Sequence, residues 1–256
     1  MPFEAIQLQS WYATPQGQMV QRLLSDVMKR WMGKRKLAAT LGFGYTQPYL
    51  DRADPWGGKL LGASPAEMGV VTWPRYLSNR VALVRPDALP FPDESFDLVI
   101  MAHLLEGAQS PGGALREAWR ILEPGGRLFA VVPNRGGIWA RRDATPFGWG
   151  RPFSPRQLHT QLQQSFFIPR QSSYALYTPP ISGRFWLRIA DAMEKAGERW
   201  LPFMGGVILC EAEKVVVAST PIDGVTMLSG GRRLTMPLAE RHRGVHGRWK
   251  HLEERS

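Results

Sequence analysis

The stretch 89-LPFPDESFDLVIMAHLLEGAQSPGGALREAWRILEPGGRLFAVVPN-134 holds two strand candidates with one helix between them. FDLVIMAH (96–103) is almost uniformly apolar, as buried parallel strands are, and LFAVVPN (128–134) is the second strand candidate. GGALREAWRIL (112–122) has the spacing of an amphipathic helix, and EPGGR (123–127) has Pro and Gly where a tight turn needs them. A strand, a helix and a strand in this order predict a parallel sheet covered by helices.

The same pattern continues on the N-terminal side of this stretch. KLAATL (36–41), GKLLGA (58–63) and VALV (81–84) are short apolar runs that read as further buried strands. SPAEM (64–68), directly after the second run, predicts the start of a helix.

On the C-terminal side the elements alternate in the same way. SPRQLHTQLQQSFF (154–167) starts with a Ser N-cap and a Pro at the first helical position, which predicts a helix. YALYTPP (174–180) is a strand candidate that its prolines end. FWLRIADAMEKAGERWLPF (185–203) has the apolar stripe of a helix that covers the sheet, with a membrane or partner face as the alternative. GVILCEAEKVVVA (206–218) is a long strand whose charged middle suggests an antiparallel edge.

The chain divides into three parts by this interpretation. QGQMVQRLLSDVMKRWM (16–32) is an amphipathic helix, and it gives residues 1–34 the character of an N-terminal helical segment. Residues 35–218 hold the alternating strands and helices of one domain. Residues 219–256 are polar, basic and glycine-containing, which predicts a flexible tail.

Composition narrows the class of protein. A chain of 256 residues with 44% hydrophobic residues can bury a core, which excludes wholesale disorder. The single cysteine, Cys210, cannot form an internal disulfide and fits a reducing compartment. The N-terminus lacks a signal-peptide pattern, and the longest apolar run, 96–105, is too short for a transmembrane segment. These features predict a cytoplasmic protein.

The net charge is unusual for such a protein. Thirty-two Lys and Arg against 22 Asp and Glu give a formal charge of +10 and a pI near 10.2. A basic surface attracts nucleic acid, anionic lipid or an acidic protein, although it also simply aids solubility. Nucleic acid therefore enters as a candidate partner on charge alone.

The stretch 89–134 resembles the second half of a class I S-adenosylmethionine-dependent methyltransferase of the type 11 group. In that family an L-P-F-P-D-x-S-F-D segment leads into strand four, and L-x-P-G-G follows the next helix; both are present here. The resemblance covers about residues 35–218. It implies an α/β fold with a doubly wound, mostly parallel, Rossmann-like seven-stranded sheet and an antiparallel last strand.

The resemblance also implies S-adenosylmethionine as cofactor, bound across the carboxyl ends of the strands. The family's glycine loop has an acid followed by three glycines at alternate positions, and the matching residues here are TLGFGYT (40–46). Gly42 and Gly44 are kept, while Thr40 replaces the acid and Thr46 replaces the last glycine. We therefore expect a modified cofactor pocket.

A second acid of the family, which holds the cofactor's ribose, is missing as well. Its matching positions are Gly62 and Ala63, and the nearest carboxylate, Glu67, lies about one helical turn further on. Asp87 matches the acid that faces the adenine amino group. Because each hydrogen bond to a charged group contributes roughly 1.5–3 kcal/mol, losing two of them weakens binding by about two to four powers of ten. The other positions expected to contact the cofactor are Phe43, Ala88, Leu89 and Ala102.

His103 is the candidate catalytic residue. It matches the first His of the family's H-x-L-E-H, where it can orient a nucleophile or accept its proton; Glu106 matches the Glu, and Gly107 replaces the second His. A structural role at the end of the strand is the competing explanation. No metal site is expected, because the histidines of the tail lack Cys or carboxylate partners at metal-ligand spacing.

The loop after the fifth strand candidate is rich in Arg and Trp. The resemblance assigns this loop to the mouth of the substrate site, with Trp139, Arg142 and Trp149 as its candidate residues. Interleaved Arg and Trp suit an anionic or aromatic substrate, or stacked nucleic-acid bases. A solvated loop whose tryptophans pack onto the core fits the sequence equally well.

Two functions remain from these features. The first is a methyltransferase that acts on an unidentified small-molecule or protein acceptor. The second is a catalytically inactive, methyltransferase-like protein that serves as a binding or regulatory subunit for a protein partner. Gly42, Gly44, Asp87 and His103 favour the first, and the two replaced loop positions with the missing ribose acid favour the second.

Overall fold

The structure, a computed structural model, describes residues 4–53, 56–181, 183–215, 217–218, 225–228 and 232–235. The chain forms two compact units, Met1–Val216 and Val217–Ser256. In the second unit, β8 (Val217–Ala218), β9 (Val225–Leu228) and β10 (Arg232–Thr235) pair as an antiparallel sheet. The rest of the segment 219–256, for which a flexible tail is predicted, lies outside the described residues.

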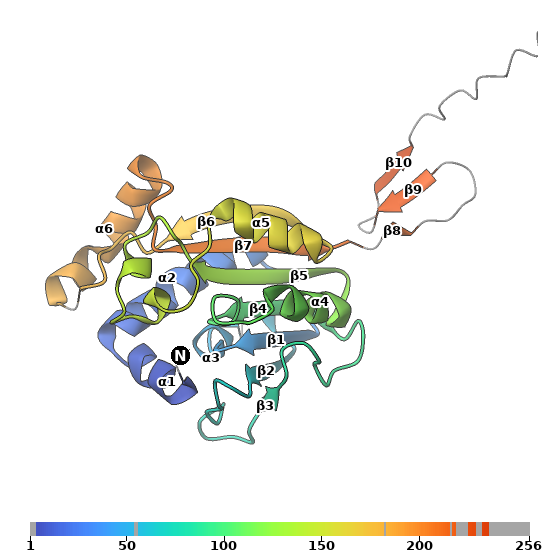
Figure 1. Cartoon of the computed structure of the whole chain (residues 1–256), viewed down its shortest axis with the longest axis horizontal. Coiled ribbons are helices and arrows are strands. Elements are labelled where there is room, and N and C mark those ends of the chain that lie inside the picture. Colours follow the sequence, from blue (N-terminus) through green and yellow to red (C-terminus); the bar gives the residue numbers. More distant parts are fainter. Residues whose placement is uncertain are drawn as a thin grey trace, which may run out of the picture. The chain divides into compact units, whose positions relative to one another are not determined.

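The first unit is built on a seven-stranded sheet with the strand order β3-β2-β1-β4-β5-β7-β6 (Figure 1). The strands are β1 (Ala39–Gly44), β2 (Lys59–Pro65), β3 (Val81–Val84), β4 (Phe96–Ala102), β5 (Leu122–Pro133), β6 (Phe167–Ala175) and β7 (Val207–Lys214). The first five are parallel to one another, whereas β7 is antiparallel to both β5 and β6. The edge position expected for 206–218 is wrong, because β7 lies between β5 and β6 and the edge strand is β6. The predicted fold class, with an antiparallel last strand, is confirmed.

Helices cover both faces of this sheet. They are α1 (Ala5–Tyr12), α2 (Pro15–Met32), α3 (Gln47–Leu50), α4 (Pro111–Ile121), α5 (Pro155–Gln164) and α6 (Arg184–Trp200). The alternation along β5 separates two cores: Phe129 and Val131 pack with α2, while Leu128 and Ala130 pack with α4 and α5. Figure 1 shows α4 and α5 over one face, α2 behind the other, and α1 beyond the carboxyl ends of β1 and β2. The carboxyl ends of β1 and β2 are therefore covered by α1, and not by the helices that pack on the two faces of the sheet.

Two boundaries differ from the expected ones in a way that matters for the site. The strand expected at 36–41 is β1, which runs through both glycines of the glycine segment to Gly44. The helix predicted to start within 64–68 is absent, so that prediction is wrong. Instead β2 stays paired with β3 as far as Pro65, and residues 66–68 form a turn. The turn is closed by a hydrogen bond from the Met68 N–H to the Pro65 carbonyl, 2.9 Å long.

Smaller differences between predicted and observed elements arise where strand pairing overrides the local sequence pattern. The predicted EPGGR turn is a bulge inside β5, because pairing with β4 passes from Phe96–Leu122 directly to Leu98–Arg127. The strand expected at 174–180 is β6, which begins earlier, at Phe167, and ends at Ala175. Its middle is polar and lies against the charged side chains of β7, so apolar spacing alone does not reveal it.

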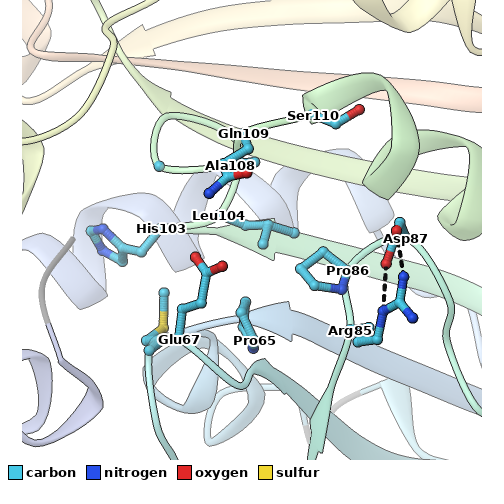
Figure 2. A pocket seen from close by; sticks show the side chains of 12 residues that line it. Pro65, Glu67, Arg85, Pro86, Asp87, His103, Leu104, Ala108, Gln109 and Ser110 are labelled. Atoms are coloured by element: carbon cyan, nitrogen blue, oxygen red, sulfur yellow. Dashed lines mark hydrogen bonds and ion pairs between the residues drawn. The ribbon is translucent and has the colours of Figure 1, made fainter. Parts of the chain in front are cut away.

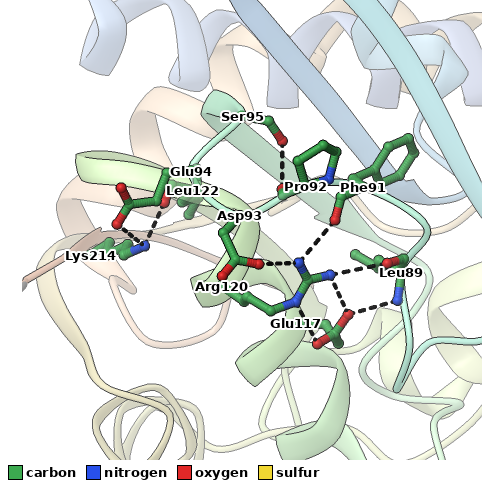
Figure 3. A network of polar contacts seen from close by, with 10 residues as sticks. All are labelled: Leu89, Phe91, Pro92, Asp93, Glu94, Ser95, Glu117, Arg120, Leu122 and Lys214. Carbon is green, nitrogen blue, oxygen red and sulfur yellow. Dashed lines mark hydrogen bonds and ion pairs between the residues drawn. The ribbon is translucent and has the colours of Figure 1, made fainter.

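One arginine holds the LPFPDESFD segment against α4 (Figure 3). The Arg120 guanidinium donates to the backbone carbonyls of Leu89 and Phe91, at 3.0 and 2.9 Å, and to the Asp93 carboxylate at 2.6 Å. It also donates to both carboxylate oxygens of Glu117, one of which accepts the Leu89 N–H at 2.7 Å. The segment is therefore fixed by a charged network as well as by its own turn residues.

We expect Arg120→Met to lower the free energy of unfolding by about 2–3 kcal/mol, because it leaves Glu117 and two carbonyls without their donor. The hydrogen bond from Arg120 lowers the pKa of Glu117, so this stabilisation is present above the carboxyl group's unfolded pKa and is lost as pH falls through the folded one. Urea unfolding between pH 3 and pH 7 measures both. The control is Arg116→Met, an exposed arginine on the same helix. An equal loss in the control, or a loss independent of pH, contradicts the network's role.

Candidate active site

The carboxyl ends of β2, β3 and β4 border a pocket of about 310 Å³, which we call the crevice (Figure 2). Its walls are mainly apolar, with carboxylates at the floor and at one end. The lining residues are Pro65, Glu67, Met68, Arg85, Pro86, Asp87, His103, Leu104, Gly107, Ala108, Gln109 and Ser110. In open α/β sheets ligands bind outside the carboxyl ends of the strands, and the crevice lies there.

Asp87 and His103 mark the two ends of the crevice (Figure 2). The Arg85 guanidinium donates to both oxygens of the Asp87 carboxylate, at 3.2 and 3.0 Å. This hydrogen bonding lowers the pKa of Asp87, so the carboxylate is ionised at neutral pH. Its outward lone pairs remain available to a donor in the crevice.

Glu67 lies between these ends, and its carboxylate is directed into the crevice (Figure 2). From the sequence, Glu67 is expected to lie one helical turn beyond the position of the ribose acid. Instead the chain stays extended through Pro65 and then turns, which brings Glu67 to the crevice. Glu67 is exposed and has no hydrogen bond or ion pair within the part of the chain that the structure describes. It is a carboxylate free to accept hydrogen bonds from a ligand.

The residues of the glycine segment do not line the crevice. Thr40 is fully buried near the start of β1, and its hydroxyl has no hydrogen-bond partner among the described residues. Phe43 packs in the same core as α4. A Cβ on Gly42 would overlap the Thr46 hydroxyl. The glycine at 42 thus makes room for a side chain of the protein itself.

Gly44 is required by the close approach of β1 to β4. Its φ of +96° disfavours any side chain, and a Cβ there would overlap the Ala102 carbonyl oxygen. That carbonyl accepts the Tyr45 N–H at 3.0 Å, so the two strands remain paired to their ends. Gly44 and Ala102, both expected to contact a cofactor, contact each other.

The remaining expected cofactor contacts also lie outside the crevice, with the exception of Asp87. Gly62 packs against Val81 of β3, and Ala63 is fully buried. The Ala88 N–H donates to the Arg85 carbonyl at 3.1 Å, and the buried Leu89 belongs to the Arg120 network.

His103 belongs to a buried chain of polar groups. It directly follows β4 in a left-handed conformation, with φ at +54°. Its Nε2 lies 2.8 Å from the Tyr12 hydroxyl, which is 2.7 Å from the Tyr49 hydroxyl, and its Nδ1 lies 3.5 Å from a Glu106 carboxylate oxygen. The chain Glu106–His103–Tyr12–Tyr49 therefore connects the end of β4 with α1 and α3.

The burial of this chain determines the ionisation state of Tyr12. Burial raises the pKa of Tyr12 well above that of a free phenol, with neighbouring Tyr49 adding to the effect, so Tyr12 is a neutral hydroxyl. The second oxygen of Glu106 is buried without a hydrogen-bond partner among the described residues. Tyr12 closes the His103 ring on its Nε2 side, and Glu106 lies on its Nδ1 side.

Tyr12 is a residue of this candidate site that the sequence did not reveal. It reaches His103 because α1 is anchored by a hydrogen bond from the Ala5 N–H to the Met68 carbonyl, 2.8 Å long. The only local signal is an aromatic pair, Trp11 and Tyr12, just before the Thr14 cap of α2. Nothing in that pattern indicates a partner 91 residues away, directly after β4.

We expect Tyr12→Phe to lower the free energy of unfolding by about 1–3 kcal/mol, because it leaves the buried His103 Nε2 and the Tyr49 hydroxyl without their shared partner. Tyr76→Phe is the matched control, since Tyr76 is 92% exposed. Urea unfolding of both variants measures the difference. A Tyr12 variant as stable as the Tyr76 variant would show that this chain contributes nothing to folding.

Of the three substrate-mouth candidates in the loop after β5, one lies in the core and two lie at the surface. Trp139 is fully buried and donates from Nε1 to the Thr178 carbonyl at 2.8 Å. Arg142 and Trp149 are both exposed, and the Trp149 indole N–H donates to the Asp143 carbonyl at 2.6 Å. Packing of a tryptophan onto the core, which the sequence left open, is therefore found for Trp139.

Membrane-spanning helices and metal-binding clusters are both absent from the described ranges. None of the helices there combines the length and the apolarity needed to span a bilayer. The same residues contain no group of three or more His, Cys, Asp or Glu side chains arranged to hold a metal ion.

The chain is similar in sequence to known methyltransferases. Residues 40–130, about a third of the chain, match a family model described as a methyltransferase domain. The chain is 51% identical over 45 residues to the ubiquinone/menaquinone biosynthesis C-methyltransferase UbiE of Pseudoalteromonas translucida, a match that covers 18% of each protein. It is 37% identical over 106 residues to UbiE of Pseudomonas syringae pv. tomato, covering 39% of this chain and 41% of that one. The chain thus spans less than half the length of these curated relatives.

Solved structures with the same fold match most of the chain. A SAM-dependent methyltransferase from Archaeoglobus fulgidus has a TM-score of 0.55 at 14% identity, covering 76% of this chain and 94% of that one. A putative methyltransferase from Haloferax volcanii, solved in complex with the Trm112 methyltransferase activator, has a TM-score of 0.54 at 18% identity, covering 80% and 95%. At these identities the likeness establishes the fold.

Proposed function

We propose that the chain is a class I S-adenosylmethionine-dependent methyltransferase whose crevice holds the adenosine part of the cofactor. The match of residues 40–130 to a methyltransferase-domain model and the shared fold support this proposal. One observation carries the proposal: two exposed carboxylates, Glu67 and Asp87, face an apolar-walled pocket at the carboxyl ends of β2, β3 and β4. Cofactor sites usually consist of an apolar pocket into which a small number of polar groups point.

The residues present fit the adenosine group. Glu67 would accept hydrogen bonds from the ribose hydroxyls, in place of the family's acid that Gly62 and Ala63 lack. Asp87 would accept from the adenine amino group, and Met68 and Leu104 would contact the purine. Bound S-adenosylmethionine supplies an electrophilic methyl group for in-line transfer, a reaction that depends mainly on positioning.

The end of the crevice at His103 is where the protein's own acid–base groups lie. His103 and Glu106 can take up a proton that an acceptor releases, and Tyr12 covers the ring nitrogen that faces α1. We propose that the cofactor pocket differs from the family's in two ways. The glycine segment serves strand packing, and Glu67 supplies the carboxylate that holds the ribose hydroxyls. An unidentified small molecule or protein is the acceptor.

Calorimetric titration with S-adenosylmethionine and S-adenosylhomocysteine tests the proposal. We expect dissociation constants in the micromolar range, about 7–8 kcal/mol of binding free energy. Absence of binding at millimolar ligand overturns it. That result favours the alternative, an inactive methyltransferase-like subunit, for which the closure of Gly44 onto Ala102 and of Tyr12 onto His103 is the supporting observation.

A further inference from the structure

A second hollow lies on the other side of the segment that follows β4. Its volume is about 570 Å³, and Ala108 lines both this hollow and the crevice. We call it the arginine groove, because Arg135, Arg151 and Arg156 are its charged lining residues and it is lined by no Asp or Glu. Gln157 and Gln161 add neutral hydrogen-bonding groups along α5.

No carboxylate among the described residues neutralises the three guanidinium groups. Within the ranges that the structure describes, none of them forms an ion pair, and Arg135 alone has a side-chain hydrogen bond, to the Pro152 carbonyl at 3.3 Å. By contrast, Arg120 and Arg127 each pair with a carboxylate. Three like charges in one groove repel one another, so an anion that enters it relieves that repulsion.

The backbone that carries these arginines is held in place. The Arg135 N–H donates to the Phe153 carbonyl at 2.9 Å, and the Arg151 N–H donates to the Glu106 carbonyl at 2.8 Å. Arg156 lies in the first turn of α5, which the Ser154 side chain caps. The groove is thus tied through Glu106 to the same segment as His103, and less ordering is needed when a ligand binds.

We infer that the arginine groove binds a small acceptor that carries phosphate or carboxylate groups, and that it holds this acceptor beside the crevice. That the bound anion is a methyl acceptor rests on the proposed function. Guanidinium groups match the geometry of phosphate and carboxylate with paired hydrogen bonds. The groove has the volume of a small-molecule site rather than of a track along a nucleic acid.

Titration of the protein with inorganic pyrophosphate and, separately, with citrate tests the inference and distinguishes phosphate from carboxylate recognition. The test variant is Arg151→Gln with Arg156→Gln. The control variant is Arg116→Gln with Arg188→Gln, which removes the same charge from exposed arginines on α4 and α6. We expect at least one of the two anions to bind the wild type and the control equally, and the test variant at least about tenfold more weakly.

Three outcomes overturn the inference. In the first, both variants bind the anion as the wild type does. In the second, neither anion binds any of the proteins. In the third, a DNA duplex binds through Arg151 and Arg156 while the small anions do not, which assigns the arginines to nucleic acid.

Parallel titration with S-adenosylhomocysteine separates this inference from the proposed function. Neither Arg151 nor Arg156 lines the crevice, so the test variant is expected to bind this ligand like the wild type. Arginine-dependent anion binding without S-adenosylhomocysteine binding leaves the anion site standing and removes the cofactor proposal. The reverse result removes the anion site and leaves the cofactor proposal.

Discussion

Replacing Thr40 by Asp is expected to lower the free energy of unfolding by about 3–5 kcal/mol and to leave cofactor affinity no higher. The family pattern has an acid at this position, but Thr40 is fully buried between Leu60 of β2 and Leu98 of β4. Its neighbours in both adjacent strands are leucines, which offer a buried carboxylate neither a positive charge nor a side-chain hydrogen bond. Burial raises the pKa of such a carboxyl group, so its folded form holds a proton that the unfolded form releases, and the loss of stability should grow as pH rises from 4 to 8.

Thr40→Val is the matched control. It keeps the shape of the side chain and removes a buried hydroxyl that has no hydrogen-bond partner in the described part of the chain, so stability should stay equal or rise by up to about 1 kcal/mol. Urea unfolding and S-adenosylhomocysteine titration of both variants measure the two effects. A Thr40→Asp protein that keeps its stability and binds the ligand more tightly would place the glycine segment in the cofactor site and contradict the account.

Replacing Glu67 by Gln is expected to weaken S-adenosylhomocysteine binding roughly tenfold to hundredfold, because a carboxylate accepts stronger hydrogen bonds than an amide does. The folding stability should not change, since Glu67 is exposed and has no hydrogen bond or ion pair among the described residues. Calorimetric titration measures the affinity and urea unfolding measures the stability. Together they separate a binding role from a structural one.

The control for that variant is Glu198→Gln, which removes the same charge from the exposed surface of α6. Its affinity for S-adenosylhomocysteine should equal that of the wild type. If the Glu67 and Glu198 variants bind equally well, the missing ribose acid has no substitute at position 67.

The fold was predictable because its signals are local. The stretch 89–134 contains β4, α4 and β5 with their connecting bulge, and each of these elements has the apolar spacing that its burial requires. The same holds for α2, whose buried face was expected over 16–32 and extends over Pro15–Met32. Where the pattern depends on pairing partners, as along β6, the boundaries shifted.

The site was predictable only in part, because its residues meet through tertiary contacts. Asp87 and His103 are predictable as residues near a cleft because each follows a strand end, and both line the crevice. Glu67 was set aside because its position depends on how far β2 stays paired with β3, which the sequence of β2 alone does not fix. Tyr12 was missed because it reaches His103 from a separate helix.

The crystal structure of the protein with bound S-adenosylhomocysteine tests the central claim most directly. The account predicts the adenosine part in the crevice, with the ribose hydroxyls on the Glu67 carboxylate and the adenine amino group on the Asp87 carboxylate. It also predicts that Gly44 and Ala102 remain in contact. Ligand bound between β1 and β4 at the glycine segment, with Glu67 left free, would contradict it.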